Sequence, residues 1–258
     1  MRLVDPSIVY LVGTAGSGKS SLAAAYHTWM EEAGHDATLV NLDPGADSLP
    51  YVPDIDIRDW ISLEEVMAEH GLGPNGAQVA AADMIALNAG EIATELEKFR
   101  PDTFVIDTPG QIELFAFRSS SLRLIDALGR ERAAVLFLLD SVMCKNPNGF
   151  ASTLMLSATV QFRLNLACRN VLTKADLLSN PDLEEMIRWS EEEGALDNAL
   201  AANISDGGSL LNIDLLRALR DVEPHKGFMV TSADSLEGME DIYADIQRLF
   251  AGGEEANK

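Results

Sequence analysis

The segment GTAGSGKS at residues 13–20 constrains the fold more than any other part of the chain. It follows an apolar run at residues 7–12, precedes a helical pattern at residues 20–33, and matches the pattern G-x-x-x-x-G-K-[ST]. Glycines in such a turn let backbone N–H groups converge on phosphate oxygens at the positive end of a helix. The segment therefore predicts a phosphate-binding loop between the first strand and the first helix of an α/β domain.

Apolar runs of strand length recur along the chain and alternate with helical patterns. Besides residues 7–12, the runs that predict strands lie at residues 37–42, 103–108, 133–140, 169–174 and 227–232. Further helical patterns lie at residues 62–70, 77–99 and 239–250. This alternation is typical of an α/β protein, and we expect a P-loop NTPase fold with a mostly parallel sheet flanked by helices.

The chain has 258 residues, 47% of them hydrophobic, which is enough for one large core. We expect a single domain over residues 1–252, with a helical insertion at about residues 180–222 and a solvated tail at residues 253–258. The longest apolar run near the middle, residues 133–139, is far shorter than the ~20 residues of a membrane helix. The first residues lack the pattern of a signal peptide, so we expect a cytoplasmic protein with no membrane partner.

The formal charge is -22, from 41 acidic and 19 basic residues. Direct binding of nucleic acid depends on clustered lysine and arginine, and no such cluster occurs here, so we exclude it. Two interpretations of the acidic surface remain, a site for a basic partner or an adaptation to concentrated salt. Because the acids are spread from Asp5 to Glu255, we favour the second interpretation and expect a halophilic source.

Two motifs predict the chemistry at the phosphates. In the phosphate-binding loop, Lys19 is expected to reach the β and γ phosphates, and the Ser20 hydroxyl to ligate Mg²⁺. In the segment FVIDTPGQ, Asp107 at a strand end would support Mg²⁺ through water, the Gly110 N–H would sense a γ-phosphate, and Gln111 would orient water. The other nucleotide-binding residues predicted in the first loop are Gly16, Ser17, Gly18 and Ser21.

The segment LTKADLL at residues 172–178 has the [NT]-K-x-D pattern that reads guanine. The Asp176 carboxylate would accept hydrogen bonds from guanine N1–H and the exocyclic amine, a pair that adenine does not offer. The stem of Lys174, next to Thr173, would cover the base. The later segment VTSAD would offer the Ala233 backbone N–H to the guanine oxygen.

The segment VNLDPGAD at residues 40–47 places Asp43 at the end of the second predicted strand. One interpretation is an ordinary Asp-Pro-Gly turn. The other is that Asp43 is a switch-region acid that polarises the attacking water or supports Mg²⁺.

Together these motifs resemble those of the GPN-loop GTPases, a family of the SIMIBI class of P-loop nucleotide hydrolases. The segments that carry the resemblance occur in the family's order and cover nearly the whole chain: GSGKSS, NLDPG, DIRDWI, GPNG, DTPGQIE, TKAD and TSAD. The resemblance implies a homodimer in which the Gly-Pro-Asn loop of each subunit, here Gly73, Pro74 and Asn75, enters the partner's nucleotide site. We expect residues 69–79 to form a rigid loop in which Asn75 presents its amide to a phosphate.

The resemblance further implies Mg²⁺-dependent GTP hydrolysis, with Lys19, Asp43, Asn75 and Gln111 as the catalytic residues. The protein would act as a switch or assembly factor for unidentified client proteins, and its acidic surface suggests a halophilic archaeon. The resemblance leads us to expect alanine at position 45, where this chain has glycine. The glycine should loosen the switch turn without removing Asp43. Two alternatives are a P-loop kinase that phosphorylates a small molecule or an RNA end, and a nucleotide-dependent scaffold that does not hydrolyse.

Overall fold

The computed structural model describes residues 6–202 and 227–251. Within these residues, the strands form one seven-stranded sheet in the order β3-β2-β4-β1-β5-β6-β7, and every neighbouring pair is parallel. The strands are β1 (Ser7–Gly13), β2 (Ala37–Asn41), β3 (Ile55–Asp56), β4 (Thr103–Asp107), β5 (Ala133–Asp140), β6 (Ala167–Thr173) and β7 (Met229–Val230). The expected α/β fold with a parallel sheet is confirmed.

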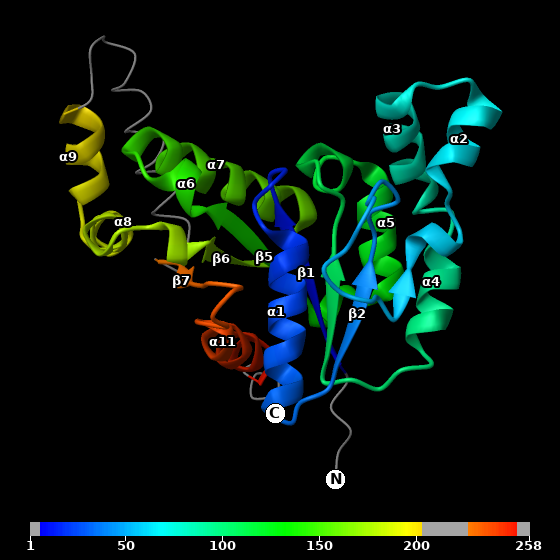
Figure 1. Ribbon diagram of the computed structural model, residues 1–258, viewed down its shortest axis with the longest axis horizontal. Helices are drawn as coiled ribbons and strands as arrows, with labels where there is room; N and C mark the ends of the chain where they lie inside the picture. Colours follow the sequence, from blue (N-terminus) through cyan, green and yellow to red (C-terminus); the bar gives the residue numbers. More distant parts are fainter. Residues whose placement is uncertain (1–5, 203–226, 252–258) are drawn as a thin grey trace.

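Helices cover both faces of the sheet (Figure 1). They are α1 (Lys19–Glu32), α2 (Leu63–His70), α3 (Pro74–Met84), α4 (Ala89–Leu96), α5 (Ser119–Leu128), α6 (Ser141–Cys144), α7 (Pro147–Leu164), α8 (Asn180–Glu191), α9 (Ala195–Ala202) and α11 (Met239–Ala251). Helices α1 and α11 pack on one face, and α3, α4, α5 and α7 contribute to the core on the other.

The central strand β1 shows why the sheet is buried on both faces. Val9 and Leu11 pack in the core beneath α1 and α11, whereas Ile8, Tyr10 and Val12 pack in the core on the opposite face. All five side chains are buried because successive side chains of a strand point to opposite faces and both faces carry helices. This explains why the strands read as continuous apolar runs.

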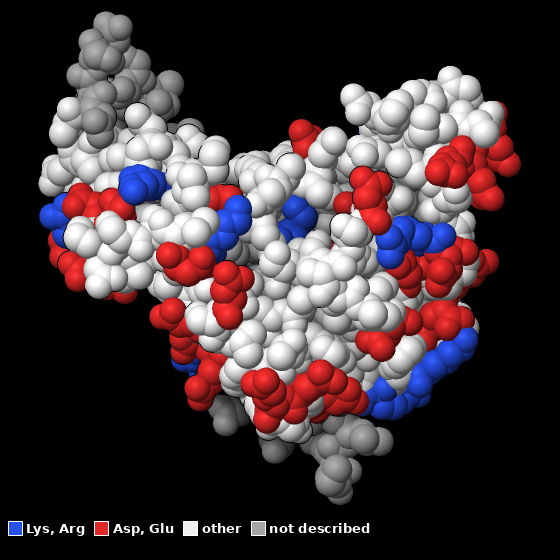
Figure 2. All heavy atoms as spheres, in the orientation of Figure 1, with Lys and Arg blue, Asp and Glu red and all other residues white. Residues whose placement is uncertain are grey.

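The strand order decides where the motifs meet. Because β1 lies between β4 and β5, the phosphate-binding loop after β1 lies at the middle of the carboxyl edge of the sheet. The loops after β2, β4 and β6 open on the same edge, since all the strands run parallel. The molecular surface is hollowed there, between the side of α6 and α7 and the side of α2 and α3 (Figures 1 and 2).

The structure corrects the expected loop in the segment that contains GPNG. Residues 77–99 are mostly helical, as expected, because they contain most of α3 and all of α4. The expected loop at residues 69–79, in contrast, is mostly helical. Only residues 71–73 separate α2 from α3, because Pro74 occupies the first turn of α3, where its fixed φ suits a helix. Strand β3 and helices α5 and α7 lie in stretches where no specific element was predicted.

The predicted domain limits stay a prediction. Helices α8 and α9 occupy the first part of the expected insertion at residues 180–222. Its remaining residues, from 203 onward, lie outside the described part of the chain, and so does the tail at residues 253–258. In the described part of the chain, no helix has the length and apolar character needed to cross a membrane.

Candidate nucleotide-binding site

The loop between β1 and α1 has the backbone shape of a phosphate-binding loop. Gly16 and Gly18 have φ values of 77° and 93°, which glycine adopts without strain, and Gly18 caps the N-terminus of α1. A Cβ atom at Gly13 would come within 2.5 Å of Ser17 Oγ, so the loop leaves no room for a side chain there. The Ser17 hydroxyl is buried and has no hydrogen-bond partner among the described residues.

Lys19 is held over this loop by backbone oxygens. Its Nζ donates to the carbonyls of Gly13 and Thr14, both at 3.1 Å, and to the carbonyl of Gly110 at 3.0 Å. Burial lowers the pKa of Lys19, and the nearby carboxylates of Asp107 and Asp43 oppose this shift. The ammonium group thus joins the first motif to the DTPGQ segment.

Asp43 links the loops after β2 and β4. Its Oδ2 accepts a hydrogen bond from the Gly110 N–H at 2.9 Å, and its Oδ1 accepts one from the Gly45 N–H at 2.9 Å. The Asp43 N–H donates to the side-chain oxygen of buried Asn41 at 3.0 Å. The Gly45 N–H thus closes the turn after Asp43, and the Gly110 N–H points to Asp43 in this structure. The loosening expected at Gly45 stays a prediction.

Asp107 ends β4 and is 1% exposed. Its Oδ2 accepts a hydrogen bond from the Tyr51 hydroxyl at 2.9 Å, while no described residue donates to the buried Oδ1 at hydrogen-bonding geometry. Burial raises the pKa of Asp107, and the neighbouring Ser20 and Tyr51 hydroxyls and Lys19 oppose the shift. A buried carboxylate oxygen with free lone pairs beside the phosphate-binding loop suits a cation or its water.

The TKAD segment is tied directly to the phosphate-binding loop. Thr173 Oγ1 donates to the Ser17 carbonyl at 2.8 Å. Lys174 adopts a left-handed backbone conformation with φ 58°, and its Nζ donates to the Gly16 carbonyl at 2.6 Å and to Asp140 Oδ2 at 2.7 Å. The stem of Lys174 therefore spans from β6 to the glycine-rich turn.

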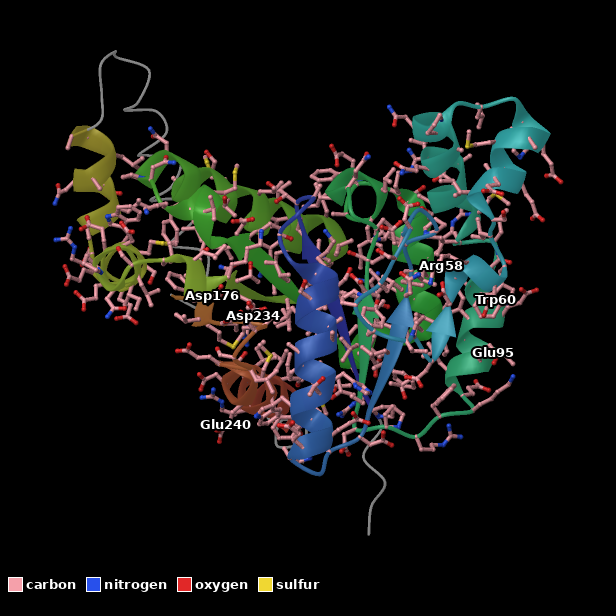
Figure 3. All side chains as sticks on the ribbon, in the orientation of Figure 1. Arg58, Trp60, Glu95, Asp176, Asp234 and Glu240 are labelled. Carbon is pink, nitrogen blue, oxygen red and sulfur yellow. The ribbon has the colours of Figure 1, made fainter. Side chains whose placement is uncertain are left out.

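Asp176 lies on the exposed turn after β6, near the end of β7 (Figure 3). Its Oδ1 accepts a hydrogen bond from Ser232 Oγ at 2.7 Å, so the TKAD and TSAD segments meet. Ala233, which comes after Ser232, is half-buried against the core under α11. The structure thus places the two segments predicted to read the base beside each other.

The GPNG segment lies at the start of α3, on the opposite side of the molecule's upper half from the TKAD segment (Figure 1). Gly73 caps α3, Pro74 begins it, and Asn75 is exposed, with no side-chain hydrogen bond to the described residues. On the next turn, Gln78 Oε1 accepts a hydrogen bond from Gln111 Nε2 at 3.2 Å. Asn75 thus makes no contact with the other predicted catalytic residues among the described hydrogen bonds, and the Gln111 side chain contacts only Gln78.

Comparisons with known proteins identify the family of the chain. A family model described as "Conserved hypothetical ATP binding protein" matches residues 11–252. The chain is 33% identical over 237 residues to the GPN-loop GTPase PAB0955 of Pyrococcus abyssi, which covers 91% of this chain and 94% of that protein. The chain belongs to the GPN-loop GTPase family. The predicted resemblance is confirmed, and so, at the level of the family, is the expectation of a GTPase.

Two further matches agree with the family. The crystal structure of the Pyrococcus abyssi GTPase in apo form is similar with a TM-score of 0.84 and 31% identity, over 94% of this chain and 96% of that one. The GPN-loop GTPase QQT1 of Arabidopsis thaliana is 33% identical over 174 residues, which are 66% of this chain and 58% of that longer relative. The description of the family model names ATP, whereas both relatives are named GTPases.

Several residues of the nucleotide-binding site belong to no sequence motif, so the sequence alone did not identify them. Tyr51 touches Asp107 from a distant loop, and Gln78 touches Gln111. The DIRDWI segment did carry a signal, as part of the resemblance. Its Arg58 pairs with Asp56 and donates to the Ala46 carbonyl at 2.8 Å, which anchors the loop after Asp43.

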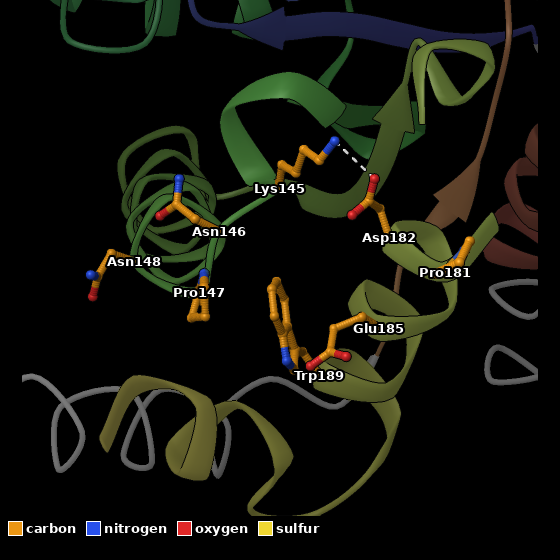
Figure 4. Close-up of a pocket in the computed structure, with 8 residues that line it drawn as sticks. All are labelled: Lys145, Asn146, Pro147, Asn148, Pro181, Asp182, Glu185 and Trp189. Atoms are coloured by element: carbon orange, nitrogen blue, oxygen red, sulfur yellow. Dashed lines mark ion pairs between the residues drawn. The ribbon is translucent and has the colours of Figure 1, made fainter. Parts of the chain in front are cut away.

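A separate pocket of about 520 Å³ lies between the start of α7 and helix α8 (Figure 4). Lys145 and Asp182 form an ion pair across it at 2.8 Å, and Trp189 lines it. None of its lining residues belongs to the phosphate-binding, switch or base-reading motifs. We therefore do not assign it to the nucleotide site.

Proposed function

We propose that this protein is a homodimeric enzyme that binds GTP with Mg²⁺, hydrolyses it, and acts as a nucleotide-dependent switch or assembly factor. The observation that carries the proposal is the set of hydrogen bonds from Lys19 to Gly110 and from Gly110 to Asp43, which joins three predicted phosphate-binding and switch segments. The test is phosphate release from GTP under single-turnover conditions, in concentrated salt. Absence of release with Mg²⁺ present and enzyme in excess over GTP would contradict hydrolysis.

Guanine selectivity rests on Asp176. The carboxylate is exposed and is oriented by Ser232, so it is available to a purine base. We expect GTP to bind much more tightly than ATP, and Asp176→Asn to lower GTP affinity by roughly 10², since two hydrogen bonds to a charged group are lost. The same variant should prefer xanthosine triphosphate, whose base offers the complementary groups. Calorimetry that finds equal GTP and ATP affinity for the unaltered protein would refute this assignment.

The residues that we assign to Mg²⁺ are Ser20, as a direct ligand, and Asp107, through water. The fit is supported by the buried Asp107 Oδ1, which no described residue satisfies. A Mg²⁺ ion that is bound with substrate phosphates keeps several waters and needs only one or two protein ligands. When bound, Mg²⁺ would neutralise charge that develops on the β and γ phosphates.

Tyr51 gives this assignment a test, because its hydroxyl orients the Asp107 carboxylate. We expect Tyr51→Phe to raise the Mg²⁺ concentration needed for half-maximal GTP turnover by about tenfold, as the loss of an outer partner of a metal site does. GTP binding measured in the presence of a chelator should be unchanged. Tyr10→Phe is the matched control, since the buried Tyr10 hydroxyl has no partner among the described residues. Identical Mg²⁺ dependence in the two variants would remove Tyr51 from the metal site.

The dimer is proposed to form through the face that carries the start of α3. Asn75 is exposed there and makes no side-chain hydrogen bond to the described residues, so its amide is available to a second subunit. Helix α3 is itself firmly seated, because Ala77, Ala81 and Ala82 are all buried. A rigid helix that presents one available amide is suited to enter a neighbouring active site.

We also propose that the acidic surface is an adaptation to concentrated salt, and hence that the source is a halophilic archaeon. Acidic side chains are spread over the visible face of the molecule, over several elements and not in one block (Figure 2). A net charge of -22 disfavours the compact state through self-repulsion unless salt screens it. Assays of GTP turnover therefore require high ionic strength.

A further inference from the structure

We propose that Gln78 is a positioning residue that holds the Gln111 side chain and so couples helix α3 to the attacking water. This inference rests on the proposed function, in which Gln111 orients that water. It assigns a role to a residue outside the motifs. Under this proposal, helix α3 carries two functional side chains. Asn75 acts in the site of the partner subunit, and Gln78 acts in the site of its own subunit.

The first observation is the contact itself. Gln111 comes directly after the DTPG segment, and its Nε2 donates to Gln78 Oε1 at 3.2 Å. Gln111 is exposed, and without a partner a glutamine side chain would lose considerable rotamer entropy on being fixed beside a phosphate. With its amide nitrogen held by Gln78, the carbonyl oxygen of Gln111 remains free to accept a hydrogen bond from water.

The second observation is the space that the Asp43 loop leaves for Gln78. A Cβ atom at Gly45 would come within 3.1 Å of Gln78 Nε2 and 3.4 Å of Asp43 Oδ1. The Gln78 amide therefore lies against the turn that contains Asp43, on one side, and against Gln111, on the other. Glycine at position 45 allows this close approach, whereas an alanine would require Gln78 to shift by a few tenths of an ångström.

The third observation is the rigidity of the helix from which Gln78 projects. The neighbouring Ala77 and the next turn at Ala81 are fully buried in the core that also contains Ile112, the residue after Gln111. Gln78 and Gln111 are thus carried by elements packed on one another. Because one rigid helix carries both Asn75 and the acceptor of Gln111, subunit docking and water positioning depend on the same element.

The test measures how Gln78→Met changes kcat in two backgrounds, the unaltered protein and Gln111→Ala. The Gln78→Met substitution preserves the length of the side chain and removes its amide. In the otherwise unaltered protein, we expect kcat for GTP to fall about tenfold with unchanged KM, as expected when a reacting group is misplaced. In the Gln111→Ala background, the same substitution should change kcat by less than about twofold, because residues that act through one another are not additive. The matched control is Gln247→Met on α11, an exposed glutamine on the other face of the sheet.

A second readout does not depend on catalysis. The side-chain amide resonances of Gln111, identified by their loss in Gln111→Ala, should shift in Gln78→Met and stay in place in Gln247→Met. Unshifted resonances, or an equal loss of kcat in both backgrounds, would overturn the role of Gln78. If the unaltered protein released no phosphate from GTP, the proposed function would fail, while the resonances would still decide whether Gln78 holds Gln111.

Discussion

Mixing two inactive variants, Lys19→Ala and Asn75→Ala, is expected to restore GTP hydrolysis. If Asn75 acts in the partner's site, the mixed dimer contains one site with an intact Lys19 and an intact Asn75. Each variant alone should lose most of its activity. The loss of a preorganised donor to developing phosphate charge costs about 3 kcal/mol, or roughly 10² in rate, and Lys19 occupies the centre of the phosphate-binding loop.

The complementation is measured as phosphate release against the fraction of mixed dimer. Light scattering and a tagged pull-down must first show that both variants dimerise and exchange subunits. If Asn75 served its own subunit, every site in the mixture would keep one defect. With exchange demonstrated, activity that stays at the level of the separate variants would therefore refute the shared site.

Asp43→Asn is expected to lower the single-turnover rate by ~10² to 10⁴, the range of a general base or a positioning group. The structure explains why GTP binding should survive. Asp43 contacts the Gly45 and Gly110 N–H groups and not the base-reading segments. An asparagine would keep one oxygen acceptor but would turn its NH₂ group toward one of the two N–H donors. One of the hydrogen bonds that Asp43 accepts from Gly45 and Gly110 would therefore be lost as well.

The matched control for this variant is Asp47→Asn, an exposed aspartate in the same loop. Its rate and its GTP affinity should equal those of the unaltered protein. A loss of GTP binding in Asp43→Asn, with an unchanged rate for the GTP that still binds, would show that Asp43 holds the nucleotide and does not act on the water.

The elements that local chemistry determines were predictable from the sequence. Strands β1, β4 and β5 were recognisable because they are buried on both faces and are apolar along most of their length. Strand β3 was missed because Ile55 and Asp56 are too short a run to show any period. In the GPNG segment, the glycines suggested a loop, yet Pro74 at the first helical position favoured the start of α3.

The site was predictable where a motif comes after a strand, because parallel strands bring their carboxyl ends together. The side-chain contacts between distant segments could not be predicted in this way. Gln78 and Gln111 are 33 positions apart, Tyr51 and Asp107 are 56 apart, and Lys174 and Gly16 are 158 apart. Side-chain contacts at such separations depend on the packing of α3 and of the loop after β2, for which a single sequence carries no periodic signal.

The position of β1 in the sheet has a consequence for how the chain folds during synthesis. Its neighbours are β4 and β5, which end at Asp107 and Asp140, so β1 has no pairing partner until a large part of the chain after it exists. At ~5–20 residues per second, that interval is on the order of ten seconds. During it, the uncharged segment Ser7–Gly13 exposes an apolar strand with unpaired edges, the kind of segment that associates with other chains. Non-local pairing of this kind is intrinsically slow, so nascent-chain protection, and not the stability of the finished sheet, should limit the yield of folded protein.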